Sequence, residues 1–250
     1  MIEIKLEFPY IKLETRDFGF LSAVKEHFSG FAPGYRFSPK YEAGVWDGKI
    51  YMLRDRKLPY GLLTDLLKLY KKDFSHVQLV LDPALGRVFN TPIKEATDLT
   101  SLKWPAAEHQ IECIAAALPY GKGIIRAATG AGKSLIMAYI AKNYFDAKYI
   151  KKLLIVVPSK SLIAQLESDF VDYGINENLI GKVFSGAKEW DKKIVISTWQ
   201  SLANNHDKLP AFDAIFIDET HSAKAVELKT ILEQACNSHV RIGFTGTLPD

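Results

Sequence analysis

The stretch from Ala127 to Ser134 constrains this chain more than any other feature, because it has the pattern of a loop that binds nucleotide phosphates. Its sequence, Ala-Ala-Thr-Gly-Ala-Gly-Lys-Ser, matches G-x-x-x-x-G-K-[ST] except that Ala127 stands in the place of the first glycine. The preceding residues 123–127 are apolar and β-branched, as in a buried strand, and residues 135–141 are apolar helix formers. The sequence therefore predicts a strand, a phosphate loop and a helix in succession.

The residue types in this loop suit the binding of ATP and Mg²⁺. Glycines allow the backbone to wrap around an anion without a Cβ atom in the way, and amides at a helix N-terminus favour negative charge. Lys133 is expected to reach the β- and γ-phosphates, and the Ser134 hydroxyl to bind Mg²⁺. The alternative is a glycine-rich turn with an exposed lysine. The predicted ATP-binding residues of the loop are Thr129, Gly130, Ala131, Gly132, Lys133 and Ser134.

A second motif lies about eighty residues further along, where residues 214–217 form an apolar run that ends in Asp218-Glu219-Thr220-His221. Acids at the carboxyl end of a strand lie in the crevice where open α/β sheets bind ligands. Asp218 is expected to hold Mg²⁺, and Glu219 to orient and deprotonate the attacking water. A helix N-cap is the alternative for such an acidic pair, but the phosphate loop at this separation argues against it.

Together, the phosphate loop and Asp-Glu-x-His resemble the first motor lobe of the superfamily-two helicases and translocases, the DEAD/DEAH-like group, in which Ala127 is an ordinary replacement. The resemblance implies that Gln110 reads adenine and that His221 takes part in catalysis. It also implies nucleic-acid backbone contacts by Pro158 and Ser159 in one motif and by Thr198 and Trp199 in another. Finally, Thr245-Gly246-Thr247 resembles the motif that couples hydrolysis to nucleic-acid binding.

The front of the chain extends the resemblance to a group of tailed-phage helicases. Its order of motifs, residues 35–39, then 46–50, then 58–62, then the motor, is similar to theirs. This resemblance implies an ATP-dependent DNA helicase or translocase in phage recombination, repair and replication. Its expected substrates are branched DNA such as junctions and stalled forks, single strands, and RNA–DNA hybrids. It implies a cytoplasmic protein, in the host cytoplasm if a phage encodes it.

Composition supports an intracellular protein without a membrane segment. The first seven residues alternate like a strand and lack a signal-peptide core, and no run approaches the roughly 18 apolar residues of a membrane helix. Two cysteines, Cys113 and Cys236, show no metal-ligand spacing, which indicates a reduced compartment.

The positive charge of the chain is concentrated in its front part. Residues 1–90 carry 14 Lys and Arg against 11 Asp and Glu, a net of +3, whereas the remaining residues carry 18 against 18. Basic and aromatic residues mix there, as on surfaces that contact a nucleic-acid backbone, and we assign Lys49, Arg54 and Arg56 to DNA contact. A small domain with core aromatic residues and solvated lysines is the alternative.

The pattern along the chain predicts an α/β protein with two domains. Residues 1–90 are expected to form a small α+β nucleic-acid-binding domain, with strands over 2–8, 35–37, 49–53 and 77–81 and helices over 17–28 and 61–70. The polar, turn-rich stretch that follows suggests a linker, residues 91–103.

Residues 104–250 are expected to form a RecA-like lobe that begins with a helix at Pro105. In this lobe, strands over 123–127, 153–157, 194–197, 214–217 and 240–244 alternate with helices over 133–144, 160–173 and 225–235. Strands that are nearly wholly apolar and alternate with helices predict a parallel sheet covered on both faces.

The sequence contains no candidate for the second RecA-like lobe that the family carries, with its arginine finger. We expect that lobe elsewhere in the complete protein, and little ATP hydrolysis by these 250 residues alone, because an arginine finger contributes roughly 10³- to 10⁵-fold in rate. Two other functions stay open at this point: the motor subunit of a restriction-type complex, and a nucleic-acid-binding module whose motor lobe regulates affinity.

Overall fold

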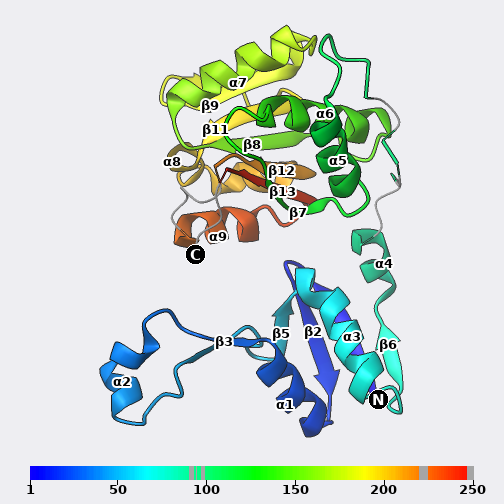
Figure 1. The fold of residues 1–250 in the computed structure, drawn as a ribbon, viewed down its shortest axis with the longest axis vertical. Coiled ribbons are helices and arrows are strands. Elements are labelled where there is room, and N and C mark those ends of the chain that lie inside the picture. Colours follow the sequence, from blue (N-terminus) through cyan, green and yellow to red (C-terminus); the bar gives the residue numbers. More distant parts are fainter. Residues whose placement is uncertain (90–92, 94, 97–98, 220–224, 247–250) are drawn as a thin grey trace. The chain divides into compact units, whose positions relative to one another are not determined.

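The computed structural model describes residues 1–89, 93, 95–96, 99–219 and 225–246, in two compact units, Met1–Arg87 and Val88–Asp250 (Figure 1). Each unit has its own sheet and its own buried core. No helix in the described residues combines the length and apolar character that crossing a membrane requires.

A mixed sheet forms the centre of the first unit. Among its described residues this sheet has four strands in the order β5-β2-β1-β6: β1 Ile2–Glu7, β2 Tyr10–Thr15, β5 Lys57–Pro59 and β6 Leu79–Leu81. β1 and β2 form an antiparallel hairpin that pairs Ile2 with Thr15, and β6 joins β1 in parallel. Alternate residues of a strand share one face, and Ile4, Ile11 and Leu13 are accordingly fully buried.

Helices of this unit cover the sheet and lead out of it. Their bounds are α1 Phe18–His27, α3 Leu63–Asp73 and α4 Pro83–Phe89. The Asp17 carboxylate begins α1 by accepting a hydrogen bond from the backbone N–H of Phe20, as an N-cap residue does. Phe20 and Val24 on α1, together with Leu63 and Leu66 on α3, are buried.

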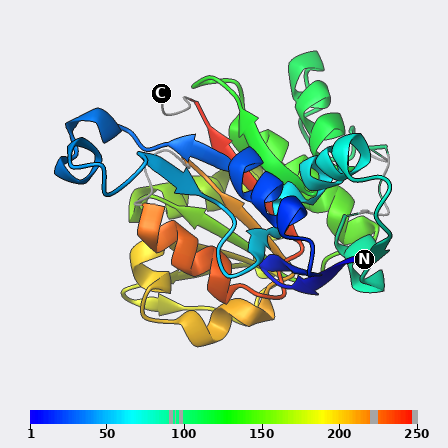
Figure 2. The same ribbon diagram turned by 90° about the horizontal axis from the view of Figure 1, so that it is seen from below.

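A narrow arm extends from the first unit, away from its four-stranded sheet (Figures 1 and 2). It consists of the antiparallel pair β3 Ser29–Phe31 and β4 Lys49–Tyr51, with α2 Pro39–Glu42 at the tip. The strand predicted over residues 35–37 is wrong: Tyr35–Phe37 forms a 3-10 turn. Its preceding residue, Gly34, has a left-handed φ of +67°, which turns the chain out of the extended conformation.

A larger sheet forms the second unit. Within the described residues it has seven strands in the order β10-β9-β11-β8-β12-β13-β7, all parallel except β10. The strand bounds are β7 Lys122–Arg126, β8 Leu153–Val157, β9 Ile180–Phe184, β10 Ala187–Lys188, β11 Ile194–Thr198, β12 Ala214–Ile217 and β13 Val240–Thr245. The helix bounds are α5 Glu108–Ala117, α6 Lys133–Asp146, α7 Lys160–Asp172, α8 Trp199–Leu202 and α9 Ala225–Gln234. This is the predicted RecA-like α/β lobe.

Two hydrophobic cores cover the two faces of this sheet. On β8, Leu153, Ile155 and Val157 belong to the core shared with α5, α6 and α7, whereas Leu154 and Val156 belong to the core shared with α8 and α9. The alternation follows from the two-residue repeat of a strand. The central strands are therefore buried on both sides, which explains their wholly apolar sequence.

Three expectations for this unit need correction. β7 is an edge strand with Ile124 60% exposed, so the strand before the phosphate loop is not buried. The helix expected from Pro105 begins at Glu108. The stretch predicted as a linker, residues 91–103, is partly packed: the side chains of Ile93 and Leu102 are buried in the core of the second unit. Helix α4 ends just before this stretch.

Candidate nucleotide and nucleic-acid sites

Three chain segments meet at the carboxyl edge of the larger sheet. The sheet order places β7, β13 and β12 side by side, so the segments that follow these strands are neighbours. They are the phosphate loop after β7, the pair Asp218 and Glu219 after β12, and Gly246 after β13. A Cβ atom at Gly246 would lie 3.6 Å from the Thr129 hydroxyl, which shows how closely the third segment approaches the loop.

The phosphate loop has the backbone conformation that its glycines permit. Gly130 and Gly132 have left-handed φ angles of +83° and +74°, where other residues are strained. Nothing lies within 4 Å of a Cβ atom built at Gly130, so the space beside the loop is open at this point. Gly132 is the N-cap residue of α6, so Lys133 and Ser134 begin that helix.

Lys133 and Glu219 form an ion pair across the site, with 3.0 Å between Nζ and Oε1. Both side chains are largely shielded, at 14% and 27% exposure. Glu219 has a φ of +48°, an uncommon angle for a residue with a side chain, and strain of this kind occurs at functional sites. The structure therefore brings two of the predicted catalytic residues into direct contact.

The two predicted Mg²⁺ ligands follow β7 and β12, which lie on either side of β13 in the sheet. Asp218 directly follows β12, and its backbone N–H donates to the Val156 carbonyl at 2.9 Å. The Ser134 hydroxyl lies 2.8 Å from the hydroxyl of Tyr173, at the end of α7. Burial raises the pKa of the Tyr173 phenol, so it stays protonated at neutral pH and can donate to or accept from Ser134. The sequence alone had no signal that placed Tyr173 beside the phosphate loop.

Gln110 lies beneath the phosphate loop. Its side-chain oxygen accepts from the Ala107 backbone N–H at 2.9 Å, and its Nε2 donates to the Ala131 carbonyl at 3.0 Å. The neighbouring His109 ring also contacts that carbonyl, at 3.2 Å. The amide of Gln110 thus joins the start of α5 to the loop. Two further predicted residues, His221 and Thr247, lie outside the described residues.

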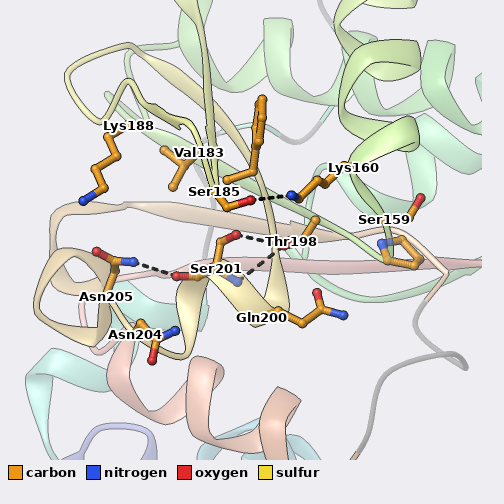
Figure 3. Close-up of a pocket in the computed structure, with 12 residues that line it drawn as sticks. Ser159, Lys160, Val183, Ser185, Lys188, Thr198, Gln200, Ser201, Asn204 and Asn205 are labelled. Carbon is orange, nitrogen blue, oxygen red and sulfur yellow. Dashed lines mark hydrogen bonds between the residues drawn. The ribbon is translucent and has the colours of Figure 1, made fainter.

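A cavity of about 600 Å³ opens at the same carboxyl edge, beyond the end of β8 (Figure 3). Pro158, Ser159 and Thr198, all assigned to nucleic-acid contact, line it. Thr198 is the N-cap residue of α8, and its hydroxyl lies 3.0 Å from that of Ser201. Trp199 does not line the cavity, because its ring packs against the core beneath α8 and α9.

The remaining wall of this cavity comes from residues that were not assigned individually to nucleic-acid contact, among them Lys160, which directly follows Ser159. Lys188 belongs to β10, and Lys160 at the start of α7 donates to the Ser185 hydroxyl in the β9–β10 turn (Figure 3). A Ser-Gly pair at residues 185–186, between two apolar runs, is a hairpin signal that could have revealed this turn. The cavity thus combines two ammonium groups with hydroxyl and amide groups, a set that suits a phosphate backbone.

The three basic residues assigned to DNA contact in the first unit have different surroundings. The Lys49 ammonium is ion-paired with Glu26 and lies 5.8 Å above the Phe31 ring. Arg54 and Arg56 are exposed. Arg54 pairs with Lys57 across a tight turn that has Arg56 at a central position. Their guanidinium groups donate to the backbone carbonyls of Tyr51 and Thr15, at 3.4 Å and 3.3 Å. Because these contacts leave their charge uncompensated, the two arginines are better candidates than Lys49 for contact with a phosphate.

The arm beside these residues carries a cluster of aromatic rings. Phe31 stacks on Tyr35 with centroids 4.5 Å apart, and Tyr35 meets Tyr41 edge to face. Phe37 is 87% exposed. A hydrogen bond to Asp47 raises the pKa of Tyr51 to about 12, so that ring is neutral at physiological pH. Exposed rings next to cations are typical of single-strand and junction binding surfaces.

The residues of the larger site fit a nucleoside triphosphate with its metal. The space beside Gly130 is open, Lys133 and the Ser134 hydroxyl stand at the end of the loop, and the Asp218 carboxylate follows β12 at the same edge of the sheet. Hard cations such as Mg²⁺ prefer oxygen ligands of this kind. These two donors would complete a shell that consists mostly of phosphate and water oxygens.

Two family models match this chain. One, described as "Type III restriction enzyme, res subunit", matches residues 103–250. The other, "DNA helicase UvsW, N-terminal", matches residues 2–79. Together they span both units of the structure.

Individual proteins agree with these models. The ATP-dependent DNA helicase uvsW of Enterobacteria phage T4 is 29% identical over 98% of this chain and 51% of its own length. A type I restriction enzyme endonuclease subunit from Staphylococcus saprophyticus is 24% identical over 62% of this chain and 18% of its own. A crystal structure of the T4 UvsW helicase has a TM-score of 0.79 at 26% identity, covering 100% of this chain and 93% of that one. The chain thus spans about half the length of the curated phage helicase.

Proposed function

This chain belongs to the superfamily-two helicases, with a motor lobe of the type III restriction res-subunit family, and from that premise we propose that it is part of an ATP-driven DNA translocase. The contact between Lys133 and Glu219 carries the proposal, because it joins the phosphate loop to the acidic motif at one sheet edge. Similarity to a DNA helicase over both units supports DNA as the track.

In this proposal each loop residue acts on ATP through the group that the structure presents. The backbone amides from Thr129 to Gly132 would hold the phosphates, and Lys133 would leave Glu219 to neutralise them. Ser134 and Asp218 would hold Mg²⁺, which when bound neutralises developing charge on the phosphates. Glu219, released from Lys133, would orient and deprotonate the attacking water.

Gln110 and the two residues outside the described part complete the proposed cycle. Gln110 would read the adenine edge. Because its amide donates a hydrogen bond to the Ala131 carbonyl, binding of the base would alter the position of the phosphate loop. His221 and Thr247 would relay the state of the γ-phosphate to the nucleic-acid side. Closure of two lobes on ATP and reopening after hydrolysis would move the protein along a strand.

The nucleic-acid track in this proposal is the cavity of Figure 3. Pro158, Ser159 and Thr198 would contact the backbone there, and Lys160 and Lys188 would neutralise phosphates. Trp199 would act by supporting α8 rather than by contact, because it packs into the core.

The arm of the first unit, with Arg54 and Arg56 at its base, would form a separate contact. Because its rings are exposed and its charge is positive, it suits unpaired bases at a branch point. We therefore propose branched DNA as the preferred substrate, with single strands and RNA–DNA hybrids as further candidates. A second RecA-like lobe would work with this one in the complete protein.

A motor subunit of a restriction-type complex is the second candidate function. The match of residues 103–250 to the restriction res-subunit model favours it. The match of residues 2–79 to the UvsW N-terminal model favours the helicase, since that segment lies outside the motor lobe.

ATP turnover by the complete gene product tests the proposal, measured with a four-way junction, single-stranded DNA or an RNA–DNA hybrid, alongside a Lys133→Ala control. Stimulation by the junction that disappears in the control supports a branch-specific DNA motor. Stimulation by single strands or hybrid alone points to a general or RNA-directed helicase. Turnover that no nucleic acid stimulates contradicts the proposal.

A further inference from the structure

A second large cavity lies at the opposite edge of the sheet from the nucleotide loop. Its volume is about 920 Å³, and it opens between the end of α6, the end of α7 and the beginnings of β8 and β11. In a parallel sheet these strand beginnings lie at one edge and the strand ends, which carry the proposed ATP and DNA sites, at the other. The cavity is therefore separate from both.

The floor of this cavity is apolar. The apolar lining residues, which together are called its floor, are Ile150, Ile194 and Leu102, with 2%, 3% and 6% of their surfaces exposed, and the partly buried Phe145 and Ile175. Apolar surface of this extent in a concave site is typical of ligand and peptide binding, because covering it releases ordered water.

The rim of the cavity is basic. Lys142, Lys148, Lys151 and Lys193 surround it, and Asp146 is the one acidic residue among its described lining residues. That carboxylate is already paired with Lys142 at 2.6 Å. Within the described part of the chain no carboxylate pairs with the other three lysines, which are exposed. The rim therefore carries uncompensated positive charge.

We propose that this cavity binds an acidic peptide segment of a partner protein, with large apolar side chains on the floor and carboxylates on the lysine rim. Complementary charge suits such a segment, because it steers encounter and fixes orientation. A lone phosphate ligand fits less well, since it would leave the apolar lining of the cavity uncovered. The site goes beyond the proposed motor function and does not depend on it.

Fluorescence anisotropy with a short fluorescein-labelled peptide of alternating aspartate and phenylalanine or leucine tests this site on the full chain. The double variant Lys148→Glu/Lys193→Glu is expected to weaken binding roughly tenfold, since each exposed charge contributes modestly. Both lysines are exposed, so the variant should fold as the parent does. The matched control, Lys208→Glu/Lys229→Glu, makes the same change of charge at exposed lysines elsewhere on the lobe and should bind like the parent.

Several results would overturn the proposal. A peptide with serine in place of phenylalanine and leucine that binds equally well would show that charge alone attracts it. Equal loss in the control variant would place the effect on net charge. If a DNA oligonucleotide displaces the peptide, and Lys148→Glu/Lys193→Glu weakens binding of that oligonucleotide, then nucleic acid is the occupant of the cavity. Absence of binding at millimolar peptide would remove the site.

Discussion

Lys133 and Glu219 form an ion pair in the structure, although the proposed mechanism gives each of them a different partner during turnover. Their contact of 3.0 Å is shielded from solvent, so it is stronger than an exposed pair. Incoming phosphates would compete with Glu219 for the lysine. The ion pair thus favours the state without nucleotide, and its exchange couples binding to release of the proposed base.

A Glu219→Gln variant should separate nucleotide binding from hydrolysis. Loss of the carboxylate removes the proposed base and should lower turnover of the whole protein by roughly 10²- to 10⁴-fold. The phosphates no longer compete with a carboxylate for Lys133, so affinity for a fluorescent ATP analogue should rise a few-fold. Glu233→Gln, on the exposed side of α9, serves as the control. Equal losses of nucleotide binding and turnover would contradict this division of roles.

Lys122 on the edge strand β7 should make the free energy of unfolding depend on pH. It stands opposite Arg241 in the β7–β13 pairing. Burial, with a smaller effect of the Arg241 charge, lowers the pKa of Lys122 to about 7. The unfolded chain keeps this proton until near its ordinary pKa of 10.5. Above pH 7 the unfolded state therefore binds more protons, and the contribution of Lys122 makes the free energy of unfolding rise with pH.

A Lys122→Met variant should have a flatter dependence of stability on pH than the parent. Between pH 7 and pH 9 the parent should gain about 1–2 kcal/mol that the variant does not, since one unit of pKa difference corresponds to about 1.4 kcal/mol. Urea unfolding at pH 7, 8 and 9 measures this, with Lys229→Met at an exposed lysine as control. Parallel curves for parent and Lys122→Met would refute the assignment.

At the scale of elements, the phosphate loop and helix α5 are built against each other. Gln110 on α5 holds the Ala131 carbonyl, and a Cβ atom on Gly132 would lie 2.3 Å from its Nε2 atom. Gly132 also has a left-handed φ of +74°, a backbone angle at which residues with a side chain are strained. The backbone angle therefore requires glycine, and a Cβ atom at this position would in addition displace the Gln110 amide from the loop.

Gly132→Ala should lower nucleotide affinity roughly tenfold, because the backbone angle strains the loop and the displaced Gln110 amide loses its hydrogen bond to the Ala131 carbonyl. The backbone angle alone should cost about 1–2 kcal/mol of stability. Gly174→Ala is the matched control, since its φ is +96° and its nearest described neighbour for a Cβ atom is 3.9 Å away. The control should lose similar stability but keep nucleotide affinity. Unchanged affinity in Gly132→Ala would rule out the role of this contact.

Elements buried on both faces were predicted well, and small or exposed ones were not. The predicted bounds of β8 and β12 are confirmed, because a wholly apolar run flanked by helices has few alternatives. The strands β2, β3, β5, β9 and β10 were missed. β2 and β5 alternate polar and apolar residues at a sheet that is half solvated, and two-residue β10 exists only through pairing with β9.

At the scale of the whole molecule, the chain combines a motor lobe with a basic, aromatic unit. Replacing Lys49, Arg54 and Arg56 by alanine should weaken DNA binding and flatten its salt dependence, because fewer counterions are released. Most of the effect should come from Arg54 and Arg56, since Lys49 is already paired with Glu26.

Binding of a four-way junction at several salt concentrations measures this effect. Alanine at Lys68, Lys71 and Lys72 on α3 changes the charge equally and serves as the control. Identical salt slopes in the parent and the Lys49/Arg54/Arg56 variant would remove these residues from the DNA interface.

Short motifs with strict chemistry and apolar runs carry information locally. The fold class, the succession of the central strands and helices along the chain, and the membership in a helicase family therefore follow from the sequence. Tertiary structure alone decided which residues meet. The contacts of Glu219 with Lys133 and of Tyr173 with Ser134 depend on strand order and helix packing. So does the lysine-rimmed cavity, which gathers residues from Ser101 to Ile194. These are long-range contacts, and no local pattern encodes a contact between segments so far apart in the chain.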